Sequence, residues 1–135
     1  KLVVPGTMLF FDLNDFKGIN DQFGHAEGDR ALTVFAGILS GLLRETDVVG
    51  RLGGDEFVAL LTNASHLEAA EIMQRLHEAV VAWNLLEQRG YNIKFSVGQT
   101  EYDSGKHASV QALLADSDQA MYSHKQLSKK AVINH

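Results

Sequence analysis

The sequence contains no cysteine and only one proline among its 135 residues. The absence of cysteine excludes disulfide scaffolds, zinc–thiolate sites and thiol catalysis. No apolar run reaches the roughly 20 residues that span a bilayer, because the longest, over residues 31–43, is interrupted by Thr33 and Ser40. No secretory signal peptide is visible. These absences are compatible with a domain that works in a reducing cytoplasm.

Composition and charge narrow the class of protein further. Hydrophobic residues make up 45% of the chain and charged residues 21%, which indicates a compact soluble domain and excludes a disordered or collagen-like chain. The length fits a single domain over residues 1–135. The net charge of −5 argues against nucleic acid as a partner, because its phosphates need a cationic surface. A nucleotide remains compatible with this charge if a divalent cation intervenes.

Hydrophobic patterning predicts the order strand, helix, strand, strand, helix, strand, helix. A continuous apolar run over residues 7–13 is typical of a strand buried on both faces, and a polar segment and loop follow it as far as residue 28. The other expected elements are a helix over 29–43 with Asp29 as its N-cap, strands over 47–51 and 56–61, a helix from the Ser65 capping box to Gly90, a half-buried strand over 93–97 and a helix over about 109–125. This order predicts an α+β fold with helices over a mostly antiparallel sheet.

Two acidic positions in this pattern suggest a metal site. Asp12 closes the first predicted strand, and Asp55 and Glu56 follow the glycines of a predicted hairpin turn, Gly53 and Gly54. Paired glycines adopt positive φ readily and let a ligand approach the backbone closely. Carboxylates at neighbouring strand ends can hold Mg²⁺, which prefers oxygen ligands and leaves room for substrate phosphates. Taken alone, however, a Gly-Gly-Asp sequence is more often simply a turn.

Competing nucleotide and metal motifs are absent from the sequence. There is no P-loop, no glycine fingerprint of a dinucleotide-binding fold and no His-Glu-x-x-His zinc motif. The segment that begins at Asp12 starts like a calcium loop, but Phe16 occupies a ligand position and Gly18 comes too late, so an EF-hand is not expected.

Four linked motifs run along nearly the whole chain in a fixed order. They are Asp12-Leu13-Asn14-Asp15-Phe16-Lys17-Gly18-Ile19-Asn20-Asp21; Phe23-Gly24-His25 with Gly28-Asp29; Arg51-Leu52-Gly53-Gly54-Asp55-Glu56-Phe57; and Ala115-Asp116 with Ala120-Met121-Tyr122 and Lys125. Together they resemble the GGDEF family of diguanylate cyclases. The resemblance implies a palm-like fold of the ferredoxin-like, nucleotidyl-cyclase type. The opening helix of the family is missing before Lys1, so we expect a domain trimmed at its N-terminus.

The resemblance also implies an activity and its partners. The family condenses two GTP molecules into cyclic di-GMP and releases pyrophosphate, so we expect a metal-dependent diguanylate cyclase that uses Mg²⁺ or Mn²⁺. In-line phosphoryl transfer depends on positioning and charge neutralisation, and a metal ion supplies both. We further expect catalysis by a homodimer, inhibition by the product, and an upstream sensor domain in a parent protein. The domain itself would be cytoplasmic, and the sequence leaves open whether the parent is attached to a membrane.

The family pattern, carried over position by position, implies a role for individual residues of this chain. The expected metal ligands are Asp12, the carbonyl of Leu13, and Asp55. The expected catalytic residues are Asp55, which helps to deprotonate the attacking hydroxyl, Glu56 beside it, and Lys17, which stabilises phosphate charge. The expected substrate-binding residues are Phe16, Asn20, His25, Asp29, Gly53, Gly54, Lys125 and Lys129. Asn20 and Asp29 would read guanine, since an amide and a carboxylate complement its hydrogen-bonding groups.

Two further features bear on affinity and regulation. Ser128 and Lys129 stand where the family usually has Gly and Arg, and a lysine lacks the bidentate fork of arginine, so the affinity for the triphosphate is in question. Arg44-Glu45-Thr46-Asp47 lies at the offset of the family's inhibitory product site, to which Arg75 would add a secondary contact. The simpler interpretation of Arg44 and Asp47 is an exposed ion pair that contributes little.

Two other functions stay open at this point. A receptor module would bind GTP or cyclic di-GMP without turnover, in keeping with the altered residues at 128–129. An adenylyl-type cyclase or polymerase palm would keep the metal carboxylates but prefer ATP. Single residues also have plainer interpretations: Asp29 as a helix cap, Asn20 as a turn residue, Lys17 as a solvated charge and His25 as a loop residue.

Overall fold

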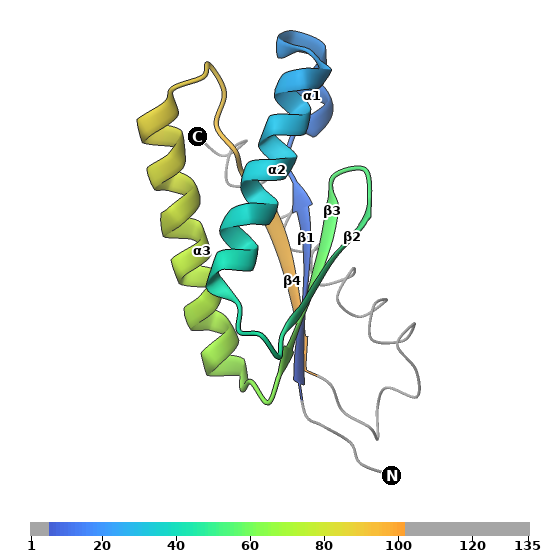
Figure 1. Cartoon of the computed structure of the whole chain (residues 1–135), viewed down its shortest axis with the longest axis vertical. Coiled ribbons are helices and arrows are strands. Elements are labelled where there is room, and N and C mark those ends of the chain that lie inside the picture. The colour runs from blue at the N-terminus through green and yellow to red at the C-terminus, as the bar shows by residue number, and fades with distance from the viewer. Residues whose placement is uncertain (1–5, 102–135) are drawn as a thin grey trace, which may run out of the picture.

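The computed structural model describes residues 6–101. The predicted helix over 109–125 and the candidate phosphate ligands Lys125 and Lys129 lie outside these residues. The described part contains seven elements in the order β1 (Gly6–Leu13), α1 (Phe16–Phe23), α2 (His25–Leu42), β2 (Val48–Gly53), β3 (Glu56–Thr62), α3 (His66–Glu87) and β4 (Phe95–Glu101) (Figure 1).

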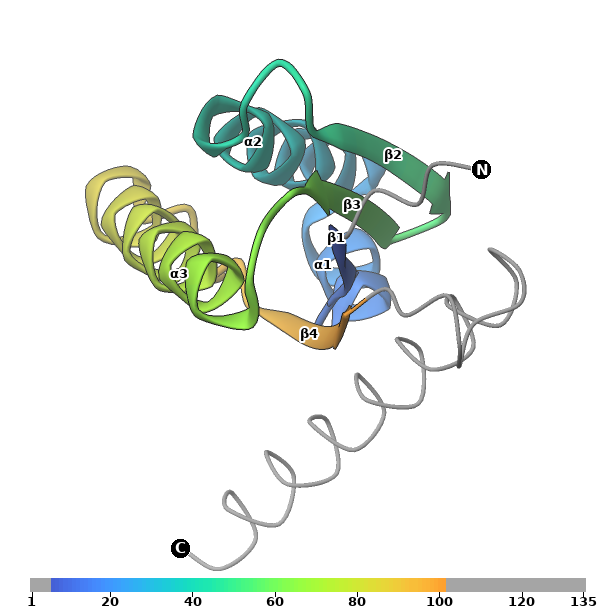
Figure 2. The same ribbon diagram turned by 90° about the horizontal axis from the view of Figure 1, so that it is seen from below.

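The four strands form one sheet with β1 near its centre. The strand order is β2-β3-β1-β4, and each neighbouring pair is antiparallel. Helices α2 and α3 cover one face of this sheet (Figure 2). The α+β arrangement expected from the sequence is therefore confirmed for the described residues. No helix within residues 6–101 is long and apolar enough to cross a membrane.

The hydrophobic core fills the space between the sheet and the two helices. Strand β1 is buried along its whole length, as predicted from its apolar run, and alternate residues of it, Leu9, Phe11 and Leu13, belong to the core. The ring of Phe11 contacts that of Phe35 on α2 with their centroids 5.7 Å apart. Because side chains alternate along a strand, Asp12 lies on the opposite face of the sheet, away from α2 and α3.

The segment between β1 and α2 differs from the prediction. A polar segment and loop were expected, but residues 16–23 form helix α1, and α2 begins at His25 rather than at Asp29. The N-cap of α2 is Gly24, with φ at 94°, so the prediction that Asp29 caps this helix is wrong. The apolar stripe begins only at Ala31 because the first turns of α2 carry polar residues, and periodicity therefore placed the start of the helix too late.

The boundaries of α3 and β4 are partly as predicted. The Ser65 capping box is confirmed, since Ser65 Oγ accepts from the Glu68 amide at 3.2 Å and Glu68 Oε1 accepts from the Ser65 amide at 3.1 Å. Helix α3 ends at Glu87 and not at Gly90. The expected strand over 93–97 begins at Phe95.

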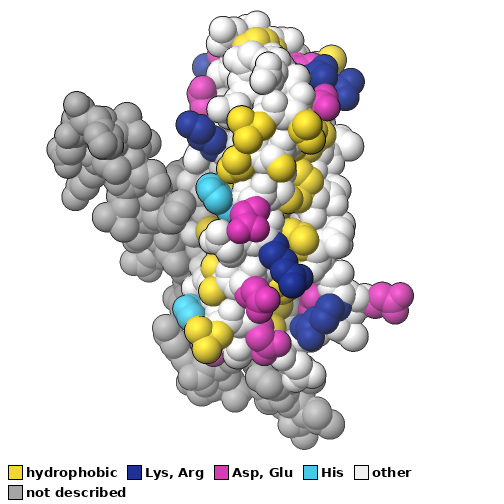
Figure 3. Space-filling view, turned by 90° about the vertical axis from the view of Figure 1, so that its left-hand side faces the viewer, with side chains coloured by type: hydrophobic (Ala, Val, Ile, Leu, Met, Phe, Trp, Pro, Cys, Tyr) yellow, Lys and Arg dark blue, Asp and Glu magenta, His cyan; other side chains and the backbone are white. Residues whose placement is uncertain are grey.

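The outer surface of α3 carries scattered apolar side chains. Figure 3 shows them among acidic and basic groups on the face that α3 forms. Leu67 and Leu86 are the most exposed, at 81% and 82%. Single exposed leucines of this kind are common on protein surfaces.

Candidate functional site

The acidic positions singled out in the sequence meet at one end of the sheet. The register of β1 and β3 pairs Asp12 with Glu56, and the Leu13 amide donates a hydrogen bond to the Asp55 carbonyl oxygen at 3.1 Å. Asp12 is buried, whereas Asp55 and Glu56 are half-buried. The fold thus sets Asp12, near the end of β1, opposite Glu56 at the start of β3, with Asp55 in the turn directly before it.

The hairpin that carries Asp55 is fixed by its glycines and by Arg51. Gly53 and Gly54 have φ values of 144° and 51°, which favour glycine, so the predicted hairpin turn is confirmed. The Arg51 guanidinium donates to the Gly54 carbonyl oxygen from Nε at 2.9 Å and from Nη2 at 2.6 Å. The sequence analysis gave Arg51 no role, although it belongs to the same motif.

Helices α1 and α2 meet at the candidate guanine-reading residues. A Cβ atom on Gly28 would lie 1.8 Å from Oδ1 of Asn20 and 3.4 Å from Cε1 of Phe16. Only glycine at position 28 therefore lets these side chains lie against α2. Asp29 is exposed on α2 directly after Gly28, and His25 is exposed at the start of the same helix.

Lys17 lies on α1 without contact to the carboxylates of the sheet. Its side chain is 91% exposed, and its ammonium group is 3.8 Å from Asp21 Oδ2 one turn later. Exposed pairs of this kind contribute little to stability. The long side chain is therefore available for a ligand at small cost.

A buried serine supports the end of β1, and the sequence analysis missed it. Ser96 on β4 pairs in register with Asp12 and is fully buried, although the pattern of alternation predicted a polar, solvent-facing position. Ser96 Oγ donates to Asn14 Oδ1 at 2.8 Å. A serine inside an apolar strand is the only signal in the sequence that points to this contact.

A second polar cluster fastens the start of α2 to the segment between α3 and β4. The Glu27 carboxylate accepts hydrogen bonds from the Arg89 guanidinium, with Nη2 to Oε2 at 3.1 Å, and from the Tyr91 hydroxyl at 2.8 Å. The bond from Arg89, followed by that from Tyr91, lowers the pKa of Glu27 to about 2. Burial and the bond to Glu27 raise the pKa of Tyr91 to about 12. Next to it, the ring of Phe23 packs on Tyr91 with the centroids 5.2 Å apart, which ties α1 to the same segment.

We expect this cluster to make the free energy of unfolding depend on pH in the acid range. A carboxyl group whose pKa is lower in the folded than in the unfolded state stabilises the fold above its unfolded pKa, and this contribution is lost as the pH falls. For Glu27 the loss should occur between its ordinary value of 4.5 and about 2. Glu27→Gln should therefore lower the free energy of unfolding at pH 7. The difference in this free energy between the variant and the parent protein should shrink towards pH 2.

Urea unfolding of both proteins from pH 7 down to pH 2 measures this difference. Glu78→Gln serves as the matched control, because Glu78 is an exposed residue of α3 that contacts only Gln74 among the hydrogen bonds of the described residues. If the difference in unfolding free energy between Glu27→Gln and the parent stays constant over this range, the Glu27 carboxylate is not the source of the pH dependence.

Arg44 and Asp47, the candidate product site, bind each other between α2 and β2. Arg44 Nη2 lies 3.2 Å from Asp47 Oδ1, and the amides of Arg44 and Thr62 also donate to this carboxylate, at 2.9 and 3.2 Å. Burial alone would raise the pKa of Asp47, but the hydrogen bonds from Arg44 and Thr62 outweigh it and lower the pKa. The Asp47 side chain is fully buried while that of Arg44 is 50% exposed. The pair therefore fastens this loop to the end of β3, while Arg75 pairs with Glu71 along α3 at 3.7 Å.

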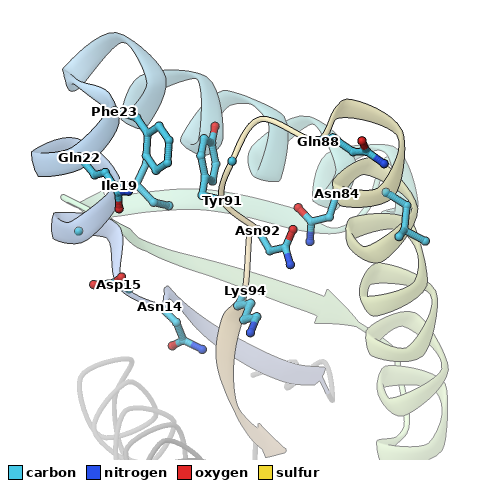
Figure 4. A pocket seen from close by; sticks show the side chains of 13 residues that line it. Asn14, Asp15, Ile19, Gln22, Phe23, Asn84, Gln88, Tyr91, Asn92 and Lys94 are labelled. Atoms are coloured by element: carbon cyan, nitrogen blue, oxygen red, sulfur yellow. The ribbon is translucent and has the colours of Figure 1, made fainter.

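A groove of about 730 Å³ opens beside α1, between this helix and the segment that joins α3 to β4 (Figure 4). Amide side chains dominate its polar lining, and Asn14, Asp15 and Lys94 lie at the end nearest β1. None of the predicted metal-binding or guanine-reading residues lines this groove. It begins, however, only two residues after Asp12.

The carboxylates at the end of the sheet fit one kind of metal ion. Within residues 6–101, no three or more His, Cys, Asp or Glu side chains converge as a metal cage would require. Mg²⁺ needs only one or two protein carboxylates when substrate phosphates and water complete its shell. Asp12 on β1 and Asp55 in the turn before β3 therefore fit a hard divalent ion that arrives with a nucleotide.

Comparisons with known proteins show what the chain as a whole is similar to. A family model described as "Diguanylate cyclase, GGDEF domain" matches residues 4–131. Diguanylate cyclase TpbB of Pseudomonas aeruginosa is 39% identical over 126 residues, which cover 91% of this chain and 28% of the relative. Several such curated relatives are much longer, and the chain spans only 11% to 35% of their lengths.

Solved structures show the same likeness. The active GGEEF domain of a diguanylate cyclase from Vibrio cholerae superimposes with a TM-score of 0.80 at 30% identity, covering 90% of this chain and 77% of that one. A structure described as a novel interaction mode between a microbial GGDEF domain and cyclic di-GMP has a TM-score of 0.75 at 31% identity, covering 90% of this chain and 73% of that one.

Proposed function

Because the chain belongs to the GGDEF family of diguanylate cyclase domains, we propose that it condenses two GTP molecules into cyclic di-GMP and pyrophosphate. The observation that carries this proposal is the register that pairs Asp12 with Glu56 and joins Leu13 to the Asp55 carbonyl at one end of the sheet. Paired carboxylates there suit phosphoryl transfer, which depends on positioning and charge neutralisation. The names of the relatives favour this activity over a receptor or an ATP-using enzyme.

In this proposal the residues at the end of β1 hold Mg²⁺ or Mn²⁺. The ligands would be Asp12, the Leu13 carbonyl and Asp55, and the bound ion would neutralise phosphate charge and favour ionisation of the attacking hydroxyl. Asp55 would help to remove the proton of the 3′-hydroxyl, with Glu56 beside it. Lys17, exposed on α1, would reach the charge that develops on the phosphates.

The guanine base would bind where α1 meets α2. Asn20 is held against α2 by the lack of a side chain at Gly28, and Asp29 follows directly on the same helix. The Asp29 carboxylate can accept from the N1–H and N2–H groups of guanine, and the Asn20 amide can donate to its acceptors. The remaining expected substrate contacts are Phe16, His25, Gly53, Gly54, Lys125 and Lys129.

Two chains are required for one cyclic product. A single chain presents one Asp12/Asp55 pair and one pair of base readers, so it activates one GTP, whereas each half of the product needs its own attack. An isologous pair of domains solves this problem. We therefore expect the initial rate of cyclic di-GMP formation to rise faster than linearly with protein concentration while the concentration is low.

Chromatography of reactions with GTP and Mg²⁺ over a range of protein concentrations tests both statements. Product formation with a superlinear dependence is the expected result. Strict proportionality would contradict the homodimer, and no product at high protein concentration would contradict the activity.

We also propose that cyclic di-GMP inhibits through Arg44 and Asp47, with Arg75 as a secondary contact. Arg44 is half-exposed while it holds the buried Asp47, so its guanidinium can still bind a phosphate or a guanine. Arg44→Ala should relieve product inhibition and leave the initial GTP turnover largely unchanged. Because the buried Asp47 loses its cation, the variant should also be less stable than the parent.

Initial rates against added cyclic di-GMP, together with unfolding midpoints, measure both effects. Arg75→Ala tests the secondary contact by itself, since it removes a cation from α3 without loosening the loop. If the inhibition curves of Arg44→Ala and the parent coincide, Arg44 serves only to fasten the loop.

The lengths of the relatives support a parent protein with more than one domain. The chain spans a minor part of each of them, so we propose that this single domain is the output module of a longer protein with an upstream sensor domain.

A further inference from the structure

Lys94 lies directly before the start of β4 and extends the functional face of the sheet. The Asn14 amide donates to the Lys94 carbonyl oxygen at 2.8 Å, so the ladder that pairs Asp12 with Ser96 continues past the strand. Side chains two residues apart lie on one face, which places Lys94 on the face of Ser96 and Asp12. Figure 4 shows the side chains of Lys94 and Asn14 next to each other and directed to the same side.

The charge of Lys94 is not neutralised by its neighbours in the described part of the chain. No ion pair joins it to any residue within 6–101, although seven other pairs do form there. Among the described residues that line the groove beside α1, Lys94 is the only cation and Asp15 the only carboxylate. The Asp15 carboxylate lies over the first turn of its own helix, 2.4 Å from the place of a Cβ atom on Gly18, where the helix N-terminus favours negative charge.

The positions of the other candidate ligands define how a bound GTP would be oriented from its base to its phosphates. Asn20 and Phe16 lie against α2 at Gly28 and do not line the groove. A GTP whose base is read there, and whose α-phosphate lies at the end of β1 beside Asp12, has its remaining phosphates on the far side of that strand end. Lys94, which lines the groove, is a described cation on that side.

We propose that Lys94 binds the terminal phosphates of GTP, the part that leaves as pyrophosphate; this assignment rests on the proposed function. In the reaction the 3′-oxygen of one GTP bonds to the α-phosphorus of the other. The bond from that phosphorus to the bridging oxygen breaks, and its electron pair stays on the departing pyrophosphate. The hydroxyl proton goes to Asp55 and then to solvent. The ammonium group of Lys94 offsets the charge that gathers on the leaving group.

Equilibrium binding separates this contact from effects on the base or on folding. The probes are a GTP analogue with a methylene bridge between the α- and β-phosphorus, which cannot be turned over, and GMP, which lacks the terminal phosphates. With Mg²⁺ present, Lys94→Met should weaken binding of the analogue about tenfold, the loss of one charge-assisted hydrogen bond. Binding of GMP should not change, and Lys94→Arg should keep most of the affinity for the analogue.

Two results would overturn the contact between Lys94 and the terminal phosphates. Unchanged affinity for the analogue in Lys94→Met, or an equal loss for GMP and the analogue, overturns it. The proposed function is tested separately by product formation in the parent protein. A parent that forms no cyclic di-GMP but loses affinity selectively for the analogue when Lys94 is replaced would refute the activity and keep the phosphate contact.

Discussion

Asp55→Asn should abolish cyclic di-GMP formation and leave the fold intact. The substitution keeps the size of the side chain and removes the anionic oxygen that would face the metal ion. The hydrogen bond that joins the hairpin to β1 uses the Asp55 carbonyl and the Leu13 amide, so it survives the change. Loss of a metal contact removes several kcal/mol of transition-state stabilisation, which corresponds to a fall in turnover of about 100-fold or more.

The measurement is initial turnover of GTP against Mg²⁺ concentration, with thermal unfolding as a check on folding. Glu78→Gln, which removes an exposed carboxylate from α3, should behave like the parent in both assays. Near-parental turnover of Asp55→Asn with the same Mg²⁺ dependence would refute a role for Asp55 at the metal.

Gly28→Ala should weaken GTP binding through a single added methyl group. That methyl group would lie 1.8 Å from Oδ1 of Asn20 and 2.8 Å from its Cγ atom, so the Asn20 side chain must leave its position against α2. Loss of its hydrogen bonds to guanine should raise the KM for GTP about tenfold or more while kcat changes less. Overpacking between the helices also costs about 1–3 kcal/mol of stability.

Gly37→Ala is a close control for this experiment. Gly37 lies on the same helix, and a Cβ atom there would meet nothing within 4 Å, so this substitution should leave the KM unchanged and stabilise α2 by about 0.5–1 kcal/mol. Discrimination between GTP and ATP gives a readout that a purely structural effect would not move. If Gly28→Ala loses stability but keeps its preference for GTP, Asn20 does not read the base.

The parts of the fold that the sequence predicted well are those with a local signal. The buried strand β1, the capping box at Ser65 and the glycine hairpin before Asp55 each depend on residues within one short segment. Helix α1 was missed because it has only eight residues, and the apolar ones among them, Phe16, Ile19 and Phe23, are too few to stand out from a loop. The start of α2 was placed at Asp29 because its first turns carry no apolar stripe.

Long-range polar contacts could not be predicted in the same way. Glu27 contacts Arg89 and Tyr91 more than 60 positions away, and Asn14 contacts Ser96 across 82 positions. Their partners are selected by strand register and by how the helices pack on the sheet. The acidic residues of the site were predictable because the motifs that carry them stay linked in order and spacing, whereas the residues that support them follow no such pattern.

The place of β1 inside the sheet has a consequence for how a metal ion would order the site. This strand is bonded on both sides, so its amides should be among the slowest to exchange with deuterated solvent, while the turn at Gly53 and Gly54 adjoins an exposed edge strand and should open far more easily. Asp12 is thus fixed before any ligand arrives, and the loss of conformational entropy on binding falls mainly on the turn. Substitutions in the turn, or of Arg51 on β2 that bonds to it, would then change metal affinity independently of the core.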